Sequence, residues 1–169
     1  MKRILKINVI NYLVILLIFS SLFFGCSLGN KEKVIMEKTL TFENNNWDFP
    51  HQTVNFIEEI PETNAPCKIV LELNHDLNIE PTTLPITVTI TSPDGSETSR
   101  RASFNFLENV NDSITSCVAF KEKYFNTEGR YKFGLYRKYS KYDLYGVKSI
   151  TVKVIKQPTD KEKSKLNQN

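Results

Sequence analysis

The sequence predicts an all-β protein, an antiparallel β-sandwich of about eight strands preceded by a lipoprotein signal peptide. Apolar residues recur at every second position in segment after segment of the 169-residue chain, and this is the period of half-buried strands. No segment shows the 3.6-residue apolar period of a long amphipathic helix. Because such alternation buries only one face of a sheet, two sheets are needed to bury both. One ordinary globular domain is therefore expected.

The chain begins with a basic, then apolar, leader. Lys2, Arg3 and Lys6 precede a 13-residue apolar run from Tyr12 to Phe24, which is typical of the n-region and h-region of a secretory signal. A helix needs about 20 apolar residues to cross a bilayer. Residues 1–25 are therefore expected to be a signal peptide and not a permanent transmembrane anchor.

The leader ends in Leu22-Phe23-Phe24-Gly25-Cys26, which resembles a bacterial lipobox. The resemblance implies that Cys26 is acylated and becomes the first residue of the mature chain. Phe23 and Phe24 depart from the usual residues, and the alternative is an ordinary signal peptide that ends near a cysteine. Two or more acyl chains hold a protein stably at a bilayer, so the partner here is a membrane, reached through a lipid anchor. Residues 26–33 are polar and are expected to form a short tether.

The expected strands follow one another between residues 34 and 156, the predicted sandwich domain. Four show strict alternation; in one of them Tyr131, Phe133 and Leu135 alternate with Lys132 and Gly134. The other four are shorter or less regular candidates. In order, the eight are Val34–Phe42, Thr53–Ile60, the segment around Ile69–Leu73, the segment around Ile86–Ile90, Glu97–Phe106, Cys117–Lys121, the segment around Tyr131–Leu135 and the segment around Ile150–Val154.

Two connections are also predicted. Ser92-Pro93-Asp94-Gly95 should close a hairpin, because Pro93 presets its own φ and Gly95 tolerates a positive φ. Residues 157–169 are rich in Lys, Asp and Glu with Leu166 as their only large apolar residue, and they are expected to be a disordered tail.

Charge excludes one class of partner. The chain has 22 Lys and Arg against 19 Asp and Glu, but Lys2, Arg3 and Lys6 belong to the leader, so the body is balanced at 19 of each. Phosphate binding needs a basic body. No nucleic-acid partner is expected.

Residue patterns for chemistry are sparse. His51 and His75 are the only histidines, so no three-histidine metal site can form, and the motifs of common hydrolases, P-loop proteins and dinucleotide-binding proteins are missing. Glu58 and Glu59 are adjacent on a strand and so point to opposite faces. The alternation of acids and amides between Asn74 and Glu80 resembles the start of a calcium loop but lacks its glycine, which favours a polar connecting loop. We expect no enzyme activity, no metal and no cofactor.

Cys67 and Cys117 are the only thiols of the body. An exported compartment permits them to pair, and both fall in or beside expected strands. They are either a disulfide or two separate small buried residues.

A tyrosine-rich segment is the main candidate for an interaction surface. Between residues 136 and 145 four tyrosines are interleaved with three bases, and Tyr and Arg are enriched where proteins contact partners. The alternative is a strand end and loop whose tyrosines cap the core. The candidate surface residues are Tyr136, Arg137, Tyr139, Tyr142 and Tyr145, together with Trp47.

Several stretches resemble the gliding-motility lipoprotein H (GldH) family of Bacteroidetes. They occur in the family's order and, with the lipobox, span most of the chain. The stretches are Asn46-Trp47, Pro66-Cys67-Lys68-Ile69-Val70-Leu71-Glu72-Leu73, the segment from Leu84 to Gly95, Gly129-Arg130-Tyr131-Lys132-Phe133 and Leu144-Tyr145-Gly146-Val147. The Gly-x-Trp-x-Gly-like stretch expected between Phe106 and Phe120 is missing, and Arg137-Lys138 replaces the expected Met-Arg, so the chain resembles a divergent member.

The resemblance implies a non-catalytic cell-envelope lipoprotein that acts as an accessory or interaction component of the gliding machinery or of a related envelope complex, with envelope proteins as partners. The tether lacks the acidic run of surface-exported lipoproteins, which favours the outer membrane and a position facing the periplasm. The alternative function is a glycan-binding β-sandwich lipoprotein. It requires Trp47 and the Tyr139 region to form one exposed aromatic platform.

Overall fold

A computed structural model describes residues 32–48, 52–107, 112–138 and 142–159. All four ranges belong to one compact unit, residues 31–169. The predicted signal peptide, Cys26 and residues 160–169 of the predicted tail lie outside the described residues. No described helix is long and apolar enough to cross a membrane.

Eight long strands and two very short ones make up the described fold. Every long strand coincides with one of the eight expected segments, with bounds that differ by a few residues at most. The strands are β1 (Lys33–Thr41), β2 (Asn46–Trp47), β3 (Thr53–Ile60), β4 (Cys67–His75), β5 (Thr83–Thr91), β6 (Glu97–Asn105), β7 (Ile114–Lys123), β8 (Gly129–Arg137), β9 (Leu144–Tyr145) and β10 (Val147–Lys156), with a 3₁₀ turn, η1 (Glu43–Asn45), before β2.

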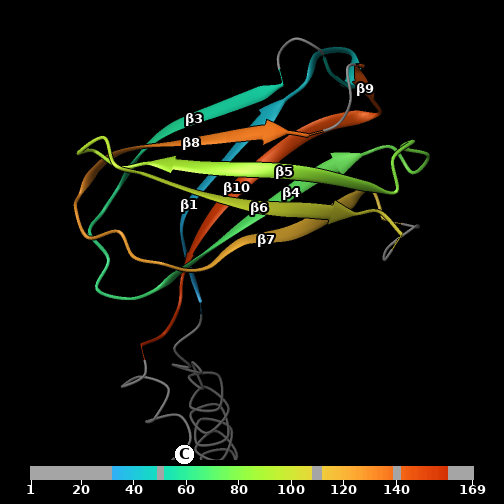
Figure 1. Cartoon of the computed structure of the whole chain (residues 1–169). Helices are drawn as coiled ribbons and strands as arrows, with labels where there is room; N and C mark the ends of the chain where they lie inside the picture. Colours follow the sequence, from blue (N-terminus) through green and yellow to red (C-terminus); the bar gives the residue numbers. More distant parts are fainter. Residues whose placement is uncertain (1–31, 49–51, 108–111, 139–141, 160–169) are drawn as a thin grey trace, which may run out of the picture. The chain divides into compact units, whose positions relative to one another are not determined.

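The long strands form two four-stranded sheets. One has the order β1-β10-β4-β7 and the other β3-β8-β5-β6; we name them the β4 sheet and the β8 sheet. Every pairing is antiparallel, and Figure 1 shows the two sheets as stacked layers. The predicted antiparallel β-sandwich is therefore confirmed.

The core lies between the sheets and follows from the alternation. On β4 every second residue from Cys67 to His75 is buried, and on β8 the same holds from Tyr131 to Arg137. Phe125 lies edge-on to Tyr131 with 4.9 Å between ring centroids. Each fully buried large apolar side chain contributes about 1.5–3 kcal/mol of transfer free energy, so the alternation alone accounts for the two-layer packing.

Contacts of charged side chains join the edge strands of the two sheets on both sides of the sandwich. On one side Lys38 of β1 pairs with Glu58 of β3 at 2.9 Å. On the other, the Arg100 guanidinium of β6 lies 5.7 Å from the ring centroid of Phe120 on β7. Side chains of the two sheets therefore contact one another along the edge strands.

The predicted hairpin turn joins β5 to β6. The Gly95 amide donates to the Ser92 carbonyl at 2.9 Å, and Gly95 has a φ of +83°. The Ser96 amide donates to the Asp94 carboxylate at 2.9 Å, and this bond lowers the pKa of Asp94. The turn chemistry expected from the sequence is confirmed.

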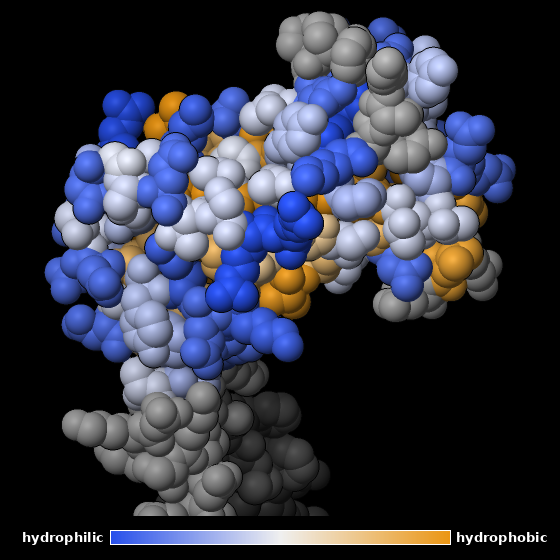
Figure 2. Space-filling model, viewed as in Figure 1, coloured by the Kyte–Doolittle hydropathy of each residue, from blue (hydrophilic) through white to orange (hydrophobic). Residues whose placement is uncertain are grey.

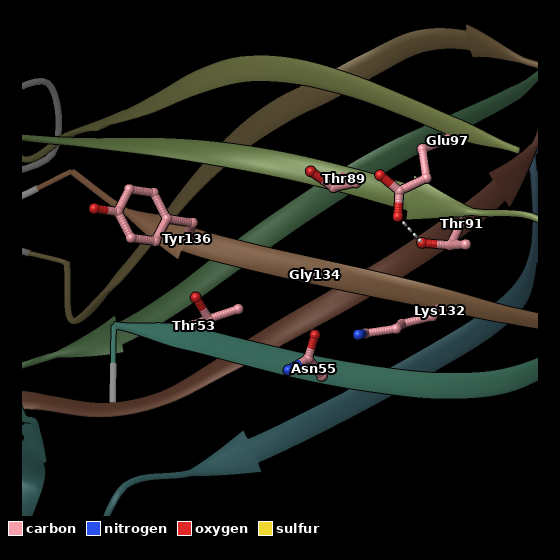
Figure 3. Close-up of a pocket in the computed structure, with 8 residues that line it drawn as sticks. All are labelled: Thr53, Asn55, Thr89, Thr91, Glu97, Lys132, Gly134 and Tyr136. Atoms are coloured by element: carbon pink, nitrogen blue, oxygen red, sulfur yellow. Dashed lines mark hydrogen bonds between the residues drawn. The ribbon is translucent and has the colours of Figure 1, made fainter. Parts of the chain in front are cut away.

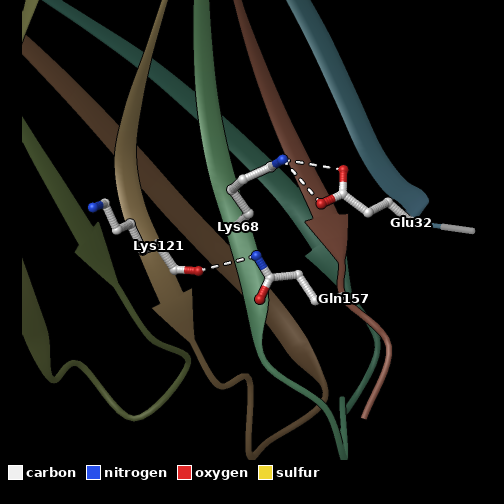
Figure 4. Close-up of polar contacts among 4 residues, drawn as sticks. All are labelled: Glu32, Lys68, Lys121 and Gln157. Carbon is white, nitrogen blue, oxygen red and sulfur yellow. Dashed lines mark hydrogen bonds and ion pairs between the residues drawn. The ribbon is translucent and has the colours of Figure 1, made fainter. Parts of the chain in front are cut away.

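The two described chain ends are more ordered than the sequence indicated. Lys33 and Lys156 pair at one end of the sandwich, so β1 includes the last residue of the expected tether. The Glu32 carboxylate accepts two hydrogen bonds of 3.0 Å from Lys68 (Figure 4). Gln157, expected to begin the tail, donates its backbone amide to the Pro66 carbonyl, and its side chain donates to the Lys121 carbonyl (Figure 4). The strands therefore begin at Lys33, one residue before the expected domain, and end at Lys156, its expected end, and Glu32 and Gln157 add contacts outside them.

Candidate functional site

The first two residues of the tyrosine-rich segment face opposite sides of the β8 sheet. Tyr136 points outward from β8 and is 41% exposed, whereas Arg137, the next residue, is fully buried. The Arg137 Nη2 donates to the Tyr142 carbonyl at 3.0 Å, so this side chain holds the following connection in place. The prediction that Arg137 belongs to an exposed surface is wrong, because strand alternation carries it into the interior.

The other described tyrosines of the segment, Tyr142 and Tyr145, follow β8 in the chain and are not part of that strand. Tyr142 and Tyr145 are 75% and 68% exposed, and Tyr145 pairs with Asn46 at the end of the sandwich opposite Lys33. The Tyr145 hydroxyl donates to Asp143 at 3.2 Å, and this carboxylate raises the pKa of Tyr145. Tyr139 lies outside the described residues.

Trp47 is a core residue. It is fully buried and stacks on Phe42 with 5.1 Å between ring centroids. It enters the core through the small β2–β9 pairing, which follows two asparagines with positive φ, Asn44 and Asn45. The prediction that Trp47 belongs to an exposed interaction surface is wrong, and no aromatic platform can include it.

Cys67 and Cys117 are free thiols. They lie on neighbouring strands, but the register pairs Cys67 with Lys123 and Cys117 with Leu71. Four residues of β4 thus separate the two positions, about 13 Å at 3.3 Å per residue, and a disulfide needs Cα atoms within about 7 Å. The disulfide alternative is wrong for this fold. Burial raises the pKa of Cys67, and it raises the pKa of Cys117 to about 12, so neither thiol is a nucleophile near neutral pH.

His75 is a satisfied core residue. Its ring nitrogens lie 2.8 Å from the Asp76 carbonyl and 2.8 Å from the Thr115 hydroxyl. Asp76, in the loop that resembles a calcium loop, pairs with Lys148 at 2.8 Å. Within the described ranges no three His, Cys, Asp or Glu side chains are placed to hold a metal ion. His51 lies outside those ranges.

A polar hollow of about 290 Å³ lies on the outer face of the β8 sheet, and we name it the Gly134 trough. Gly134 is at its centre, between Asn55 of β3 and Thr89 of β5 in the register. Figure 3 shows Tyr136 at one end and Lys132 with Glu97 at the other. The full lining is Thr53, Asn55, Thr89, Thr91, Glu97, Lys132, Gly134 and Tyr136.

Hydrogen bonds fix part of this lining. The Thr89 and Ser99 hydroxyls are 2.8 Å apart, and the Thr91 hydroxyl donates to Glu97 at 3.0 Å. Asn55, Lys132 and Tyr136 have no side-chain partner among the described residues. Oriented hydroxyls and available amide, ammonium and phenol groups are the features that orient ligands in small-molecule sites.

Gly134 opens the trough at a position where glycine is unusual. Glycine inside a strand weakens it and marks a bulge, a bend, or a site that a ligand or another backbone approaches closely. The pairing of β8 runs in unbroken register on both sides of Gly134, which excludes a bulge. A Cβ atom here would be 3.4 Å from the Asn55 amide oxygen and 3.8 Å from the Thr89 carbonyl, so packing does not demand glycine either. A bend of β8 and close approach from outside are the reasons that remain.

A second hollow of about 440 Å³ adjoins the trough and is basic. Tyr136 lines both hollows, and beyond it lie Arg100, Arg101 and Lys138. Arg101 and Lys138 have no ion-pair partner among the described residues. We name this hollow the Arg101 hollow. The outer face of the β8 sheet, turned to the viewer in Figures 1 and 2, is mainly hydrophilic.

Sequence reasoning found Tyr136 but missed the rest of this site. The signal was present, because residues between the buried positions of each strand must point outward. The alternation predicts that Gly134 and Lys132 are outward residues of their strand. What the sequence did not show was that Asn55, Thr89 and Glu97 lie beside them.

Comparison of the chain with models of known families, with curated proteins and with solved structures finds no match.

Proposed function

We propose that the protein is a membrane-tethered, non-catalytic binding protein of the bacterial cell envelope, acting as an accessory component of the gliding machinery or of a related envelope complex. The contact surface is the outer face of the β8 sheet. The observation that carries this proposal is the Gly134 trough, a hollow in a regular sheet face lined by polar groups that lack partners among the described residues.

Several features support binding rather than catalysis. The thiols of Cys67, which is buried, and Cys117, which is partly buried, stay protonated near neutral pH, and both ring nitrogens of His75 are occupied by hydrogen bonds. Among the described residues, Glu97 is the only carboxylate that lines the trough, so the two-carboxylate arrangement of acid-base catalysis is not formed there. These groups suit recognition of a partner.

The leader supports tethering. Gly25-Cys26 follows the 13-residue apolar run, and acylation there holds the domain at the membrane, at the outer membrane facing the periplasm in this proposal. Metabolic labelling with a fatty-acid analogue should mark the wild-type chain and not the Cys26→Ser variant. Equal labelling of both would contradict the anchor.

Photo-crosslinking in intact cells tests the contact surface. A benzophenone amino acid is placed at Ser99, exposed on the outer face of the β8 sheet, or at Ser116, exposed on the outer face of the β4 sheet. Both positions are serines on edge strands, so each is the control for the other. We expect cross-linked products from position 99 and few from position 116. Equal yields from the two positions would contradict the proposal that the outer face of the β8 sheet is the contact surface.

A further inference from the structure

We infer that the Gly134 trough and the Arg101 hollow together bind an anionic saccharide, with one pyranose ring on Tyr136 and its acidic group beside Arg101 and Lys138. The inference rests on the proposed binding function and names its ligand class. It differs from the glycan platform expected from the sequence, which needed Trp47 and the loop around Tyr139.

Tyr136 is the group shared by the two hollows. It is 41% exposed and stands between a polar, nearly neutral trough and a basic hollow. A pyranose ring presents C–H groups on its faces and hydroxyls at its rim, which matches an aromatic face surrounded by polar groups. Tyr136 is thus placed to contact the ring while its neighbours bond to the rim.

The trough offers bonds suited to sugar hydroxyls. The Asn55 amide both donates and accepts, Lys132 donates, and Glu97 accepts. These side chains come from three different strands and surround Gly134, as Figure 3 shows. Because Gly134 has no side chain, a pyranose ring can approach the backbone of β8 closely.

Charge selects an anionic ligand. Arg101, Lys138 and Lys132 have no acidic partner among the described residues, and in that part of the chain Glu97 is the only acid that lines either hollow. Arg binds carboxylate or phosphate oxygens in a bidentate manner. A uronic acid and a sugar phosphate share this chemistry, and the experiment below distinguishes them.

The test is calorimetric titration of the full-length lipidated chain in detergent micelles. The probes are tetragalacturonate, its neutral counterpart galactotetraose, mannotriose phosphate, neutral mannotriose and inorganic phosphate. We expect at least one acidic saccharide to bind tenfold or more tightly than its neutral counterpart and than inorganic phosphate. Preference for the first or the third probe identifies a carboxylate or a phosphate ligand.

Variants assign the site. Tyr136→Ala and Gly134→Thr should each weaken binding of the preferred saccharide at least tenfold, the second by filling the trough. Arg101→Gln with Lys138→Gln should abolish the preference for the acidic over the neutral probe. Tyr124→Ala is the matched control, since Tyr124 is 50% exposed and lines neither hollow. It should leave the affinity unchanged.

Three results would overturn the inference: equal affinity for acidic and neutral probes, no binding of any saccharide at millimolar concentration, or binding that the Tyr136 and Gly134 variants leave intact. If saccharides fail while position 99 still cross-links to a protease-sensitive partner in cells, the binding function stands and only its ligand class is wrong. If both fail, the assignment of the face is wrong as well.

Discussion

The outer faces of the two sheets differ in how completely their polar and charged side chains pair with one another. On the β4 sheet, charged side chains neutralise one another across strands: Lys153 of β10 lies 2.9 Å from Glu72 and 3.4 Å from Glu37. The Thr39 and Thr151 hydroxyls lie 2.7 Å apart on the same face. On the β8 sheet the corresponding central row is open, with Gly134 in the middle.

The difference identifies the face available for binding. A face whose ion pairs are complete, as at Lys153 and Glu72, offers a ligand little that water does not already supply. A face with oriented hydroxyls, with bases that have no acidic partner in the described part of the chain and with Gly134 at its centre has groups that a ligand can engage. Substitutions at equivalent positions of the two faces can therefore test the comparison.

The largest expected effect is a difference in stability between variants of an inward and an outward residue of β8. Arg137→Ala should lower the free energy of unfolding by about 2–4 kcal/mol, because it opens a cavity at a fully buried position and leaves the partly buried Tyr142 carbonyl without its Arg137 donor. Tyr136→Ala should cost less than about 1 kcal/mol. Urea denaturation measures both. Arg137→Met, which keeps most of the volume, should fall between them; equal losses at positions 136 and 137 would contradict the orientation of the strand.

The next largest effect is expected from two opposite substitutions, glycine to threonine and threonine to glycine, at the centres of two strands. Gly134→Thr should raise the free energy of unfolding by about 0.5–1 kcal/mol, because a β-branched residue replaces glycine in a central strand without positive φ. Thr151→Gly, at the centre of β10, should lower it by about 1 kcal/mol. Thermal unfolding of both variants measures the pair. Destabilisation by Gly134→Thr would show that packing, not ligand approach, requires the glycine.

Charge removal should give a smaller difference. Lys153→Met should lower the free energy of unfolding by up to about 1 kcal/mol at pH 7, and Lys132→Met by less than about 0.5 kcal/mol. The hydrogen bond to Glu72 raises the pKa of Lys153 above its ordinary value. The contribution of Lys153 is therefore fully present below about pH 10.4 and is lost as the pH rises through the folded-state pKa. A loss that grew on acidification through neutral pH would contradict this assignment.

The smallest expected effect is that of a reducing agent. Because Cys67 and Cys117 are free and about 13 Å apart along β4, dithiothreitol should leave the midpoint of urea unfolding unchanged. Both thiols should react slowly with Ellman's reagent in the native state and fully in urea. A fall in the midpoint on reduction would show a cross-link that this register forbids.

The sequence by itself determined the strands, the turn and which side of each strand faces inward. Alternation fixes the two faces of β8, so Tyr131 and Phe133 are buried and Lys132 is exposed for a reason that needs no partner strand. The Ser92–Gly95 turn is equally local, because it depends on the φ values that Pro93 and Gly95 allow. The same alternation, extended by two residues from Leu135, predicts that Arg137 points into the core.

Only the tertiary structure decided which residues meet. The order β3-β8-β5-β6 places Asn55, Gly134 and Thr89 in one row although they are far apart in the chain. The register of β7 against β4 likewise separates Cys67 from Cys117. Strand order and register come from the packing of whole sheets, in which a shift by one residue turns every side chain to the other face, and no local sequence pattern encodes that choice.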